Sequence, residues 1–446
     1  MGKLFGTDGV RGIANAELTP EMAFILGRAA TYFFGKEHAQ PVFIIGRDTR
    51  ISGHMLECAL AAGICSAGGK AIAIGIAPTP AVAYLSRKLG AQAGVVISAS
   101  HNPFADNGIK FFAGNGYKLP DAAEEQIEAL VLNKEDVLPR PTGDKIGIVE
   151  YRPELVSDYE DFVISTVKGS FNKLTIVVDC ANGAASRVAP AVLKRLGAKV
   201  IVLNDSPDGV NINKGCGSTH LHQLQEAVLE HKADIGIGHD GDADRCLAVD
   251  EQGNIVDGDQ IMVICALNLM RDGQLKDNTL VTTVMSNIGL HRAIKEAGGK
   301  VIITPVGDRY VLEEMLEHGY VLGGEQSGHI IFSAYNTTGD GVLTALKLIE
   351  AVNMSDKKLS ELAALMTRYP QVLVNVRVKS KQGWQENKAI ANAISAGDSE
   401  LADNGRILVR PSGTEPLIRV MAEGPDLDQL HRIVNTIADT IRKEQS

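Results

Sequence analysis

The stretch Val96-Ile-Ser-Ala-Ser100-His-Asn-Pro103 is an apolar run that ends in polar residues. The run predicts a buried β-strand, and Pro103 ends its pairing. Ligands of α/β proteins collect beyond the carboxyl ends of such strands, so Ser100 lies where a nucleophile is useful. A serine at this point also suits a plain turn, and no G-x-S-x-G elbow surrounds it, which argues against an α/β-hydrolase. A catalytic role for Ser100 therefore depends on the other loops.

A second strand-like run ends in Asp240-Gly-Asp242-Ala-Asp244-Arg245. Carboxylates at alternating positions can converge on one cation, and in a buried loop they would repel one another without it. The spacing partly fits an EF-hand, but Arg245 takes the place of the required glycine and the flanks are strand-like. A solvated acidic turn is the alternative. Because all-oxygen sites favour Mg²⁺, this loop and Ser100 together indicate phosphoryl chemistry.

Two later loops also offer binding groups. Gly324-Glu325-Gln-Ser327-Gly328-His329 places an acceptor and a donor suited to sugar hydroxyls between glycines, although a simple hairpin would give the same pattern. The other loop combines guanidinium groups, hydroxyls and a glycine, as a phosphate cradle does, with a surface turn as the alternative; its residues are Arg410, Ser412, Gly413, Thr414 and Arg419.

Length and composition limit the class of protein. A chain of 446 residues suggests about three or four units. The net charge of −10 argues against a broad surface for nucleic acid. No apolar run is long enough to span a bilayer and no signal peptide is recognisable, so we expect a cytosolic protein without a membrane partner. The 6 cysteines form no C-x-x-C pair and are expected to be reduced core residues.

Strand-like and helix-like segments alternate through most of the chain, which predicts an α/β fold with parallel or mixed sheets. In the first unit we expect strands near 42–47, 70–76 and 93–98, and a helix capped by Ser52. After Pro370 the pattern changes to alternating strands and one terminal amphipathic helix, as in a small α+β domain. The expected domains are residues 1–152, 153–256, 257–368 and 369–446.

The four loops, in this order, resemble those of the α-D-phosphohexomutase family. The opening Phe5-Gly-Thr-Asp-Gly-Val-Arg11-Gly is most similar to the bacterial branch that acts on glucosamine phosphates. The resemblance implies three similar α/β domains with mixed sheets and a smaller C-terminal α+β domain around a central cleft. It also implies reversible conversion of glucosamine 6-phosphate to glucosamine 1-phosphate through a phosphoserine and a 1,6-bisphosphate.

The resemblance assigns roles to individual residues. Ser100 matches the phosphorylated serine, and one Mg²⁺ would be bound by Ser100, Asp240, Asp242 and Asp244. Candidates for proton transfer are Lys110, His101 and His329, while Arg245 would support the aspartate loop or the phosphoryl group. Thr7 and Arg11 would line the cleft, and Glu325 and Ser327 would contact sugar hydroxyls. The non-reacting phosphate would be held by Arg410, Ser412, Gly413, Thr414 and Arg419.

The family resemblance also suggests that the protein is a homodimer. It implies that the protein binds a small sugar phosphate, with glucosamine or glucose 1,6-bisphosphate as activator. Several functions stay open on the sequence. A phosphomannomutase or phosphoglucomutase would share these loops, because none of them reads the 2-substituent of the sugar directly. A metal-dependent phosphatase would release inorganic phosphate instead of an isomer. A non-catalytic sugar-phosphate sensor would have no need of Ser100 together with the three aspartates.

Overall fold

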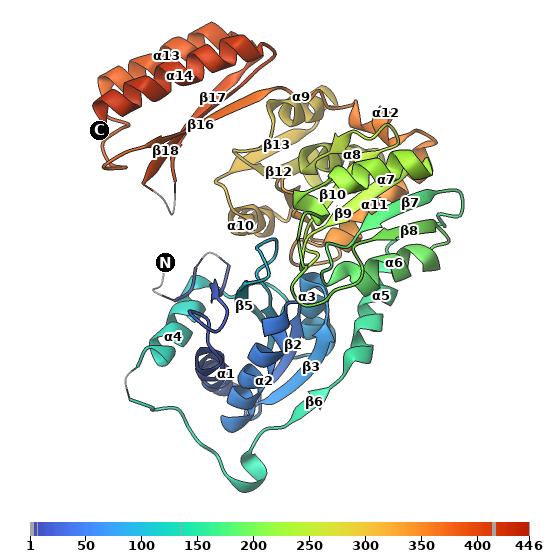
Figure 1. Ribbon diagram of the computed structural model, residues 1–446, viewed down its shortest axis with the longest axis vertical. Coiled ribbons are helices and arrows are strands. Elements are labelled where there is room, and N and C mark those ends of the chain that lie inside the picture. The colour runs from blue at the N-terminus through green and yellow to red at the C-terminus, as the bar shows by residue number, and fades with distance from the viewer. Residues whose placement is uncertain (1–3, 7, 134, 413–415, 446) are drawn as a thin grey trace. The chain divides into compact units, whose positions relative to one another are not determined.

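The structure is a computed structural model that describes residues 4–445 apart from 7, 134 and 413–415. The chain forms two compact units. The larger comprises Met1–Val284 and Val301–Ala364, and the smaller comprises Met285–Lys300 and Leu365–Ser446. Strands and helices alternate in the larger unit, whereas the smaller one contains a separate antiparallel sheet (Figure 1).

The first sheet of the larger unit has 6 strands in the order β1-β5-β4-β2-β3-β6. Their bounds are β1 Val10–Ile13, β2 Val42–Arg47, β3 Lys70–Ile76, β4 Ala93–Ile97, β5 Asp106–Ala113 and β6 Val149–Tyr151. β2 is parallel to β3 and β4, whereas β5 is antiparallel to both β4 and β1. Since β4 and β5 are antiparallel neighbours, residues 98–105 join them at the carboxyl end of β4. This connection carries Ser100.

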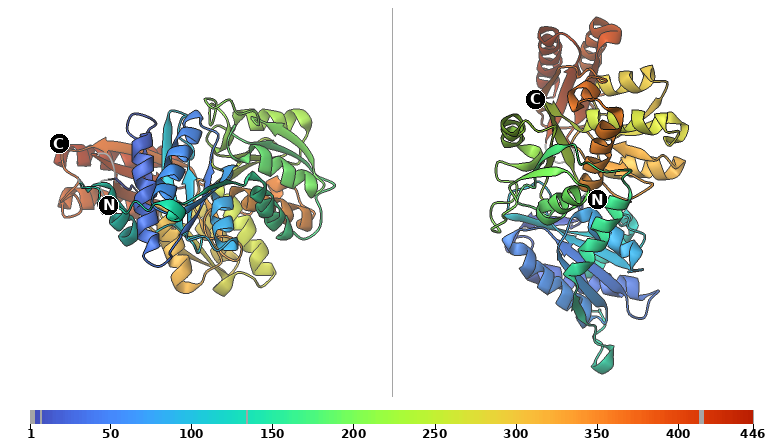
Figure 2. Two further views of the ribbon diagram at one scale, coloured as in Figure 1. Left: turned by 90° about the horizontal axis from the view of Figure 1, so that it is seen from below. Right: turned by 90° about the vertical axis from the view of Figure 1, so that its right-hand side faces the viewer.

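Helices cover both faces of this sheet. One core is shared by β2, β4 and β5 with α1 (Pro20–Gly35), α2 (Ile51–Ser66) and α4 (Asp121–Val131), and α1 and α2 lie side by side (Figure 2). α3 (Thr79–Lys88) packs on the opposite face, where a side chain on Gly46 would meet Val82. The expected cap at Ser52 is wrong, because the helix starts at Ile51 and Arg50 occupies the cap position. The Ser52 hydroxyl accepts a hydrogen bond from Asn107 instead.

The second sheet repeats this layout in the order β11-β10-β9-β7-β8. β7 is parallel to β8 and β9, and β9 and β10 form an antiparallel pair joined by residues 240–245. The strands are β7 Thr175–Asp179, β8 Lys199–Leu203, β9 Ile235–His239, β10 Cys246–Asp250 and β11 Ile255–Val256. The neighbouring helices are α5 Val156–Ser165, α6 Ala185–Arg195 and α7 His222–His231. The aspartate loop thus occupies the place that the Ser100 loop has in the first sheet.

The third sheet, in the order β13-β12-β14-β15, follows the same plan. Parallel β12 and β14 are followed by an antiparallel turn from β14 to β15, which contains residues 325–329. The strands are β12 Thr279–Thr283, β13 Lys300–Thr304, β14 Leu322–Gly324 and β15 Ile330–Phe332. The helices are α8 Gly258–Arg271, α10 Asp308–His318, α11 Gly341–Ser355 and α12 Leu359–Ala363. The prediction of three similar α/β domains with mixed sheets is therefore confirmed. Each of these sheets together with its helices forms one α/β layer of the larger unit.

The smaller unit contains an antiparallel sheet in the order β16-β18-β17. The strands are β16 Gln371–Arg377, β17 Arg406–Pro411 and β18 Leu417–Glu423. Two long helices, α13 (Lys388–Leu401) and α14 (Leu427–Glu444), share one core with this sheet, and α9 (Ile288–Glu296) belongs to the same unit. α14 begins as predicted, because the Asp426 side chain accepts a hydrogen bond from the Gln429 amide. The smaller α+β domain is therefore also confirmed.

Buried hydrogen bonds join the three sheets of the larger unit. The Thr337 hydroxyl donates to the Gly116 carbonyl at 2.6 Å, and the Asn336 amide donates to the Pro80 carbonyl at 3.3 Å. The Thr49 hydroxyl donates to the Asn182 carbonyl at 2.5 Å. Short 3-10 helices complete the connections, at Gly143–Lys145, Pro153–Leu155, Gly217–Thr219 and Lys276–Asn278, with a fifth at Ala402–Asn404 in the smaller unit.

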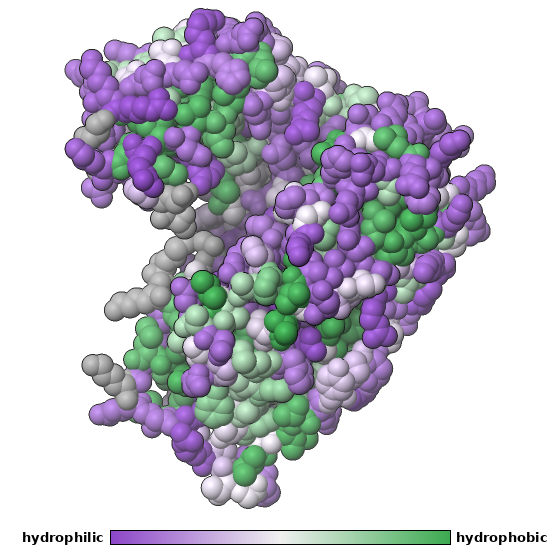
Figure 3. Space-filling model, viewed as in Figure 1, coloured by the Kyte–Doolittle hydropathy of each residue, from purple (hydrophilic) through white to green (hydrophobic). Residues whose placement is uncertain are grey.

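The surface is mainly hydrophilic on the face shown in Figure 3, where apolar residues form separate patches. Within the part of the chain that the structure describes, no helix is both long enough and apolar enough to cross a membrane.

Candidate active site

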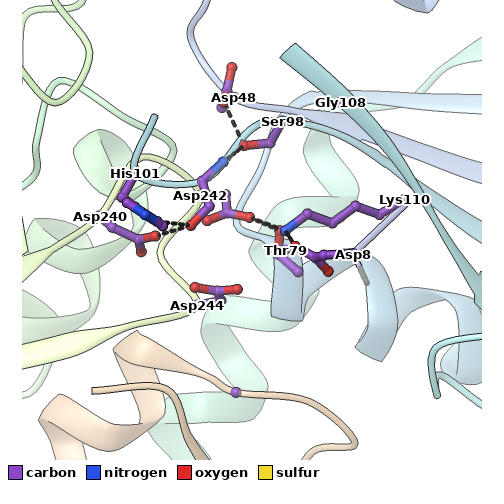
Figure 4. Close-up of polar contacts among 12 residues, drawn as sticks. Asp8, Asp48, Thr79, Ser98, His101, Gly108, Lys110, Asp240, Asp242 and Asp244 are labelled. Atoms are coloured by element: carbon purple, nitrogen blue, oxygen red, sulfur yellow. Dashed lines mark hydrogen bonds and ion pairs between the residues drawn. The ribbon is translucent and has the colours of Figure 1, made fainter. Parts of the chain in front are cut away.

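Ser100 follows β4 directly and is buried, with 2% of its surface exposed. Its φ of +50° lies in the left-handed region, which is uncommon for a residue with a side chain. The Ser100 hydroxyl donates to Asp240 Oδ2 at 2.6 Å, and His101 Nδ1 lies 3.4 Å from the same hydroxyl oxygen. Burial, together with Arg245 and Arg11, lowers the pKa of His101. The turn therefore presents the serine directly to the aspartate loop. Figure 4 shows His101 of this turn beside Asp240.

Asp240, Asp242 and Asp244 are buried, and a carboxylate oxygen from each lies within 4.8 Å of the others. Burial and the two neighbouring carboxylates raise the pKa of Asp240 well above its usual value. Asp242 Oδ1 and Asp244 Oδ1 are buried without a hydrogen-bond partner among the described residues. Unpaired buried carboxylate oxygens are costly unless a cation neutralises them. The donor set therefore fits a hard divalent metal ion.

Lys110 on β5 is buried and links the first sheet to the aspartate loop. Its ammonium lies 3.1 Å from Asp242 Oδ2 and 2.9 Å from Asp8 Oδ2 (Figure 4). Burial opposes the charge on Lys110, but Asp242 and Asp8 outweigh it and raise the pKa of the amine. Lys110 is thus a cation in this arrangement. It can stabilise negative charge.

A chain of charges extends from Lys110 toward the third sheet. Asp8 Oδ1 pairs with Lys118 at 2.7 Å, and Lys118 pairs with Asp308 at 2.6 Å. Burial would raise the pKa of Asp8, but Lys110, Lys118 and Arg11 hold it well below its usual value. Arg11, which was predicted to line the cleft, is itself ion-paired with Asp8. Asp8, Lys118 and Asp308 were not found from the sequence.

His329 lies between the aspartate loop and this chain of charges. Its Nδ1 is 3.4 Å from Asp244 Oδ2 and its Nε2 is 3.6 Å from Asp308 Oδ2. Burial disfavours the charged imidazole, yet Asp244 and Asp308 raise the pKa of His329. Gly339 leaves room for the ring, because a Cβ there would lie 2.5 Å from it.

Arg245 and the loop before β15 complete this part of the site. The Arg245 amide donates to Asp240 Oδ1 at 3.2 Å, and its backbone forms a bridge with His329. The Glu325 carboxylate accepts a hydrogen bond from the Gly307 amide at 3.2 Å. The buried Ser327 hydroxyl oxygen has no hydrogen-bond partner within the described ranges. The two side chains predicted to contact sugar hydroxyls thus lie on the loop that is joined to the aspartate loop.

The predicted phosphate loop belongs to the smaller unit. Arg410 on β17 lies opposite Arg419 on β18, and burial followed by the charge of Arg419 lowers the pKa of Arg410. Ser412 is buried, and its carbonyl accepts a hydrogen bond from Lys381 at 2.7 Å. Two neighbouring guanidinium groups are suited to an anion. Thr7, Gly413 and Thr414 lie outside the described residues.

The sequence matches four descriptions of one family along almost its whole length. Residues 2–137, 155–253 and 257–369 match phosphoglucomutase/phosphomannomutase alpha/beta/alpha domains I, II and III, and residues 373–440 match its C-terminal domain. The chain belongs to the phosphoglucomutase/phosphomannomutase family. The family and the fold class predicted from the sequence are therefore confirmed. The predicted domain boundaries and the roles of individual residues stay predictions.

Curated members of this phosphohexomutase family include bacterial proteins of high similarity. The phosphoglucosamine mutase of Symbiobacterium thermophilum is 58% identical over 100% of both chains. That of Heliobacterium modesticaldum is 57% identical and covers 99% of this chain and 100% of its own.

Solved phosphohexomutase structures share the fold at lower identity. A phosphoglucomutase/phosphomannomutase family protein from Burkholderia thailandensis has a TM-score of 0.83 at 23% identity and covers 99% of this chain and 97% of its own. Aspergillus fumigatus N-acetylphosphoglucosamine mutase, solved in complex with GlcNAc-6P and magnesium, has a TM-score of 0.71 at 19% identity, with 99% and 96% covered.

Proposed function

We propose that this chain is a phosphoglucosamine mutase, an isomerase that interconverts glucosamine 6-phosphate and glucosamine 1-phosphate and so supplies precursors for cell-wall synthesis. The observation that carries this proposal is the 2.6 Å hydrogen bond from Ser100 to Asp240, inside a cluster of three buried carboxylates. Full-length relatives at 54–58% identity that are named phosphoglucosamine mutase support the choice of sugar.

The chemistry is a phosphoryl transfer in two directions. The free C1 hydroxyl of glucosamine 6-phosphate attacks the phosphorus of phosphoserine 100, the P–Oγ bond breaks, and glucosamine 1,6-bisphosphate forms. After the bisphosphate turns over, Ser100 Oγ attacks the 6-phosphate and the product is released. One proton leaves the attacking hydroxyl and one is returned to the leaving oxygen in each half-reaction. Glucosamine or glucose 1,6-bisphosphate would also load the serine initially.

Asp240, Asp242 and Asp244, with a phosphoserine oxygen, would hold one magnesium ion, which when bound supplies positive charge to the transferring phosphoryl group. Among the residues that the structure describes, Asp242 Oδ1 and Asp244 Oδ1 are buried without a hydrogen-bond partner, which suits a cation. Lys110, placed 3.1 Å from Asp242, adds a second positive charge on the side of the first sheet. Charge stabilisation and positioning supply most of the catalysis in phosphoryl transfer.

Proton transfer has three candidates from the sequence resemblance. His101 lies 3.4 Å from the Ser100 hydroxyl and is the candidate nearest to the reacting oxygen in this form of the protein. Burial opposes the charge on Lys110, but Asp242 and Asp8 raise its pKa, so Lys110 holds its proton tightly and is better suited to stabilising negative charge. His329 lies 3.4 Å from Asp244 and is suited to proton transfer near the sugar, whose hydroxyls Glu325 and Ser327 would contact.

Arg410, Ser412 and Arg419 would hold the phosphate that is not being transferred. Arg11 and Arg245 would contact substrate or the phosphoryl group. A homodimer and a cytoplasmic location complete the proposal, as the resemblance to the family suggests.

The decisive experiment follows the isomer by NMR. The purified chain is mixed with glucosamine 6-phosphate, Mg²⁺ and a trace of bisphosphate, and kcat/KM is compared for glucosamine, glucose and mannose phosphates. We expect glucosamine 1-phosphate to form, with the highest kcat/KM for glucosamine. Ser100→Ala should abolish isomerisation. Ser66→Ala should not, because Ser66 lies in α2 and its hydroxyl donates to the Gly63 carbonyl of the same helix.

Two outcomes would refute the proposal. Release of inorganic phosphate in place of an isomer would favour a phosphatase, and full activity in Ser100→Ala would remove the serine from the reaction. A higher kcat/KM for glucose or mannose phosphate would reassign the chain to another branch of the same family.

A further inference from the structure

The loop that carries Ser100 is held by a single guanidinium group. Arg50 Nη2 donates to the carbonyls of Ser100 and Asn102, each at 2.9 Å. Nη1 donates to the carbonyls of Asp106, at 3.0 Å, and Pro103. Nε donates to Asp48 Oδ2 at 2.8 Å. All five N–H groups of the guanidinium are therefore used. Three of them hold the backbone between β4 and β5, and a fourth holds Asp106, the first residue of β5.

Arg50 is buried with its counter-ion. The side chains of Arg50 and Asp48 both have 0% exposure. Asp48 also fixes the direction of Arg50, because Asp48 Oδ1 accepts a hydrogen bond from the Arg50 amide at 3.0 Å. A buried arginine that donates to four carbonyls cannot be replaced by lysine without loss, since an ammonium has three donors in a different geometry.

The same pair holds the other side of Ser100. The Ser100 amide donates to Ser98 Oγ at 2.9 Å, and the Ser98 hydroxyl donates to Asp48 Oδ2 at 2.6 Å. The backbone of Ser100 is thus bound at its N–H through Ser98 and Asp48, and at its carbonyl by Arg50. The second layer contributes Asn213, whose Nδ2 donates to the Ser100 carbonyl at 2.8 Å and to the Asn102 carbonyl at 3.1 Å. These bonds fix a residue whose φ is +50°.

We propose that Arg50, aimed by Asp48, is a positioning residue for the phosphoserine, an inference that rests on the proposed function. The mutase must present the same serine to two ends of one sugar, and a phosphoserine that shifts would meet water more often than the sugar hydroxyl. Displacements of about 1 Å can cost about 10²-fold in rate. Arg50 therefore controls the ratio of isomerisation to hydrolysis without touching the substrate.

The hydrolytic side reaction gives a readout that a purely structural role would not change. Water attacks the phosphorus, the P–Oγ bond breaks, inorganic phosphate leaves, and Ser100 Oγ regains a proton. Arg50→Lys should lower kcat by about 10²-fold while KM stays within about threefold of the wild-type value. The phosphate released per isomer formed should rise by about tenfold.

The matched control is Arg28→Lys. Arg28 is also buried in the first layer and donates to a carboxylate, Asp136, and to the Leu138 carbonyl, but neither partner belongs to the serine loop. Arg28→Lys should lower the melting temperature in a similar way and leave both kcat and the phosphate-to-isomer ratio unchanged. Equal kcat and equal ratios in the two variants would overturn the proposal.

Asp48→Asn is the second variant, because it keeps Arg50 and removes the carboxylate that directs it. If Arg50→Lys does not fold, Asp48→Asn should show the same fall in kcat and the same rise in hydrolysis, and a wild-type ratio in this variant would overturn the inference. Peptide mass spectrometry of the wild-type protein distinguishes failure of the proposed function from failure of the role proposed for Arg50. Isomerisation without phosphate on Ser100 would refute the proposed function, and this inference with it.

Discussion

A methyl group added at Gly241 is a sharp test of how closely the serine and aspartate loops must approach each other. Gly241 lies between Asp240 and Asp242, and a Cβ there would lie 2.5 Å from the Ser100 carbonyl oxygen and 2.9 Å from Asn213 Nδ2. Unstrained non-bonded contacts of carbon are about 3.5–4.0 Å, so the serine backbone must retreat by on the order of 1 Å. Gly241→Ala removes no functional group.

We expect kcat of Gly241→Ala to fall by about 10²-fold, which corresponds to about 2.7 kcal/mol in the activation free energy. The reason is that the 2.6 Å contact between Ser100 and Asp240 lengthens as the loops separate. Overpacking of this kind costs about 1–3 kcal/mol of stability, so the protein should still fold. Steady-state kinetics and thermal melting of the purified variant measure the two effects.

Gly35→Ala is the matched control, because a Cβ at Gly35 would meet nothing within 4 Å. This variant should keep wild-type kcat. If Gly241→Ala also kept kcat within about threefold of wild type, the two loops would not need this close approach, since a shift of the predicted size should lower kcat far more.

Three other changes test the metal loop, the phosphate loop and a partly buried carboxyl group on α4. Asp242→Asn should keep the fold but lose most turnover and weaken metal binding, measured by calorimetry; unchanged turnover after chelation would exclude a metal. Arg410→Ala should raise KM by about ten- to a hundredfold, from a lost contact of about 1.5–3 kcal/mol, yet keep phosphate on Ser100. Burial raises the pKa of Glu124 to about 7, so its contribution to stability is complete at low pH and is lost as the pH rises through about 7. Glu124→Gln should therefore melt higher than wild type at pH 8 but not at pH 5, by calorimetry, and equal melting at pH 8 would contradict the shift.

Much of the fold was predictable because its main strands are buried apolar runs that end in polar loops. The predicted strand near 93–98 corresponds to β4, and that near 42–47 corresponds to β2. β5 was not predicted, since buried polar residues interrupt its apolar pattern: Asn107 and Lys110 are 0% and 3% exposed. Lys110 is buried because it pairs with Asp242 and Asp8. The expectation that a buried strand is an apolar run therefore failed where the site places a charged side chain inside a strand.

The site was predictable where one loop supplies several groups, and not where partners meet from distant parts of the chain. The three aspartates follow a single strand. Asp8, Lys118 and Asp308 have ordinary sequence surroundings, and their roles appear only when segments about 190 residues apart are brought together, as in the Lys118–Asp308 pair. The sequence did contain a signal that could have identified Arg50, since the polar residues Arg47-Asp-Thr-Arg50 also follow an apolar strand.

The hydrogen bonds between the three α/β layers have a consequence for domain exchange among relatives. In the bonds from Thr337 to Gly116, Asn336 to Pro80, Thr49 to Asn182 and Asn213 to Ser100, a side chain donates to a backbone carbonyl. Any sequence with the same backbone offers those carbonyls, so in these four bonds the donor side chain is the part that depends on residue identity. A chimera that receives a foreign layer should therefore keep these bonds if Thr49, Asn213, Asn336 and Thr337 are kept or carried with it. It must also keep the side-chain pairs Ser100–Asp240, Lys110–Asp242 and Lys118–Asp308. Sugar preference could then evolve in one layer without redesign of its neighbours.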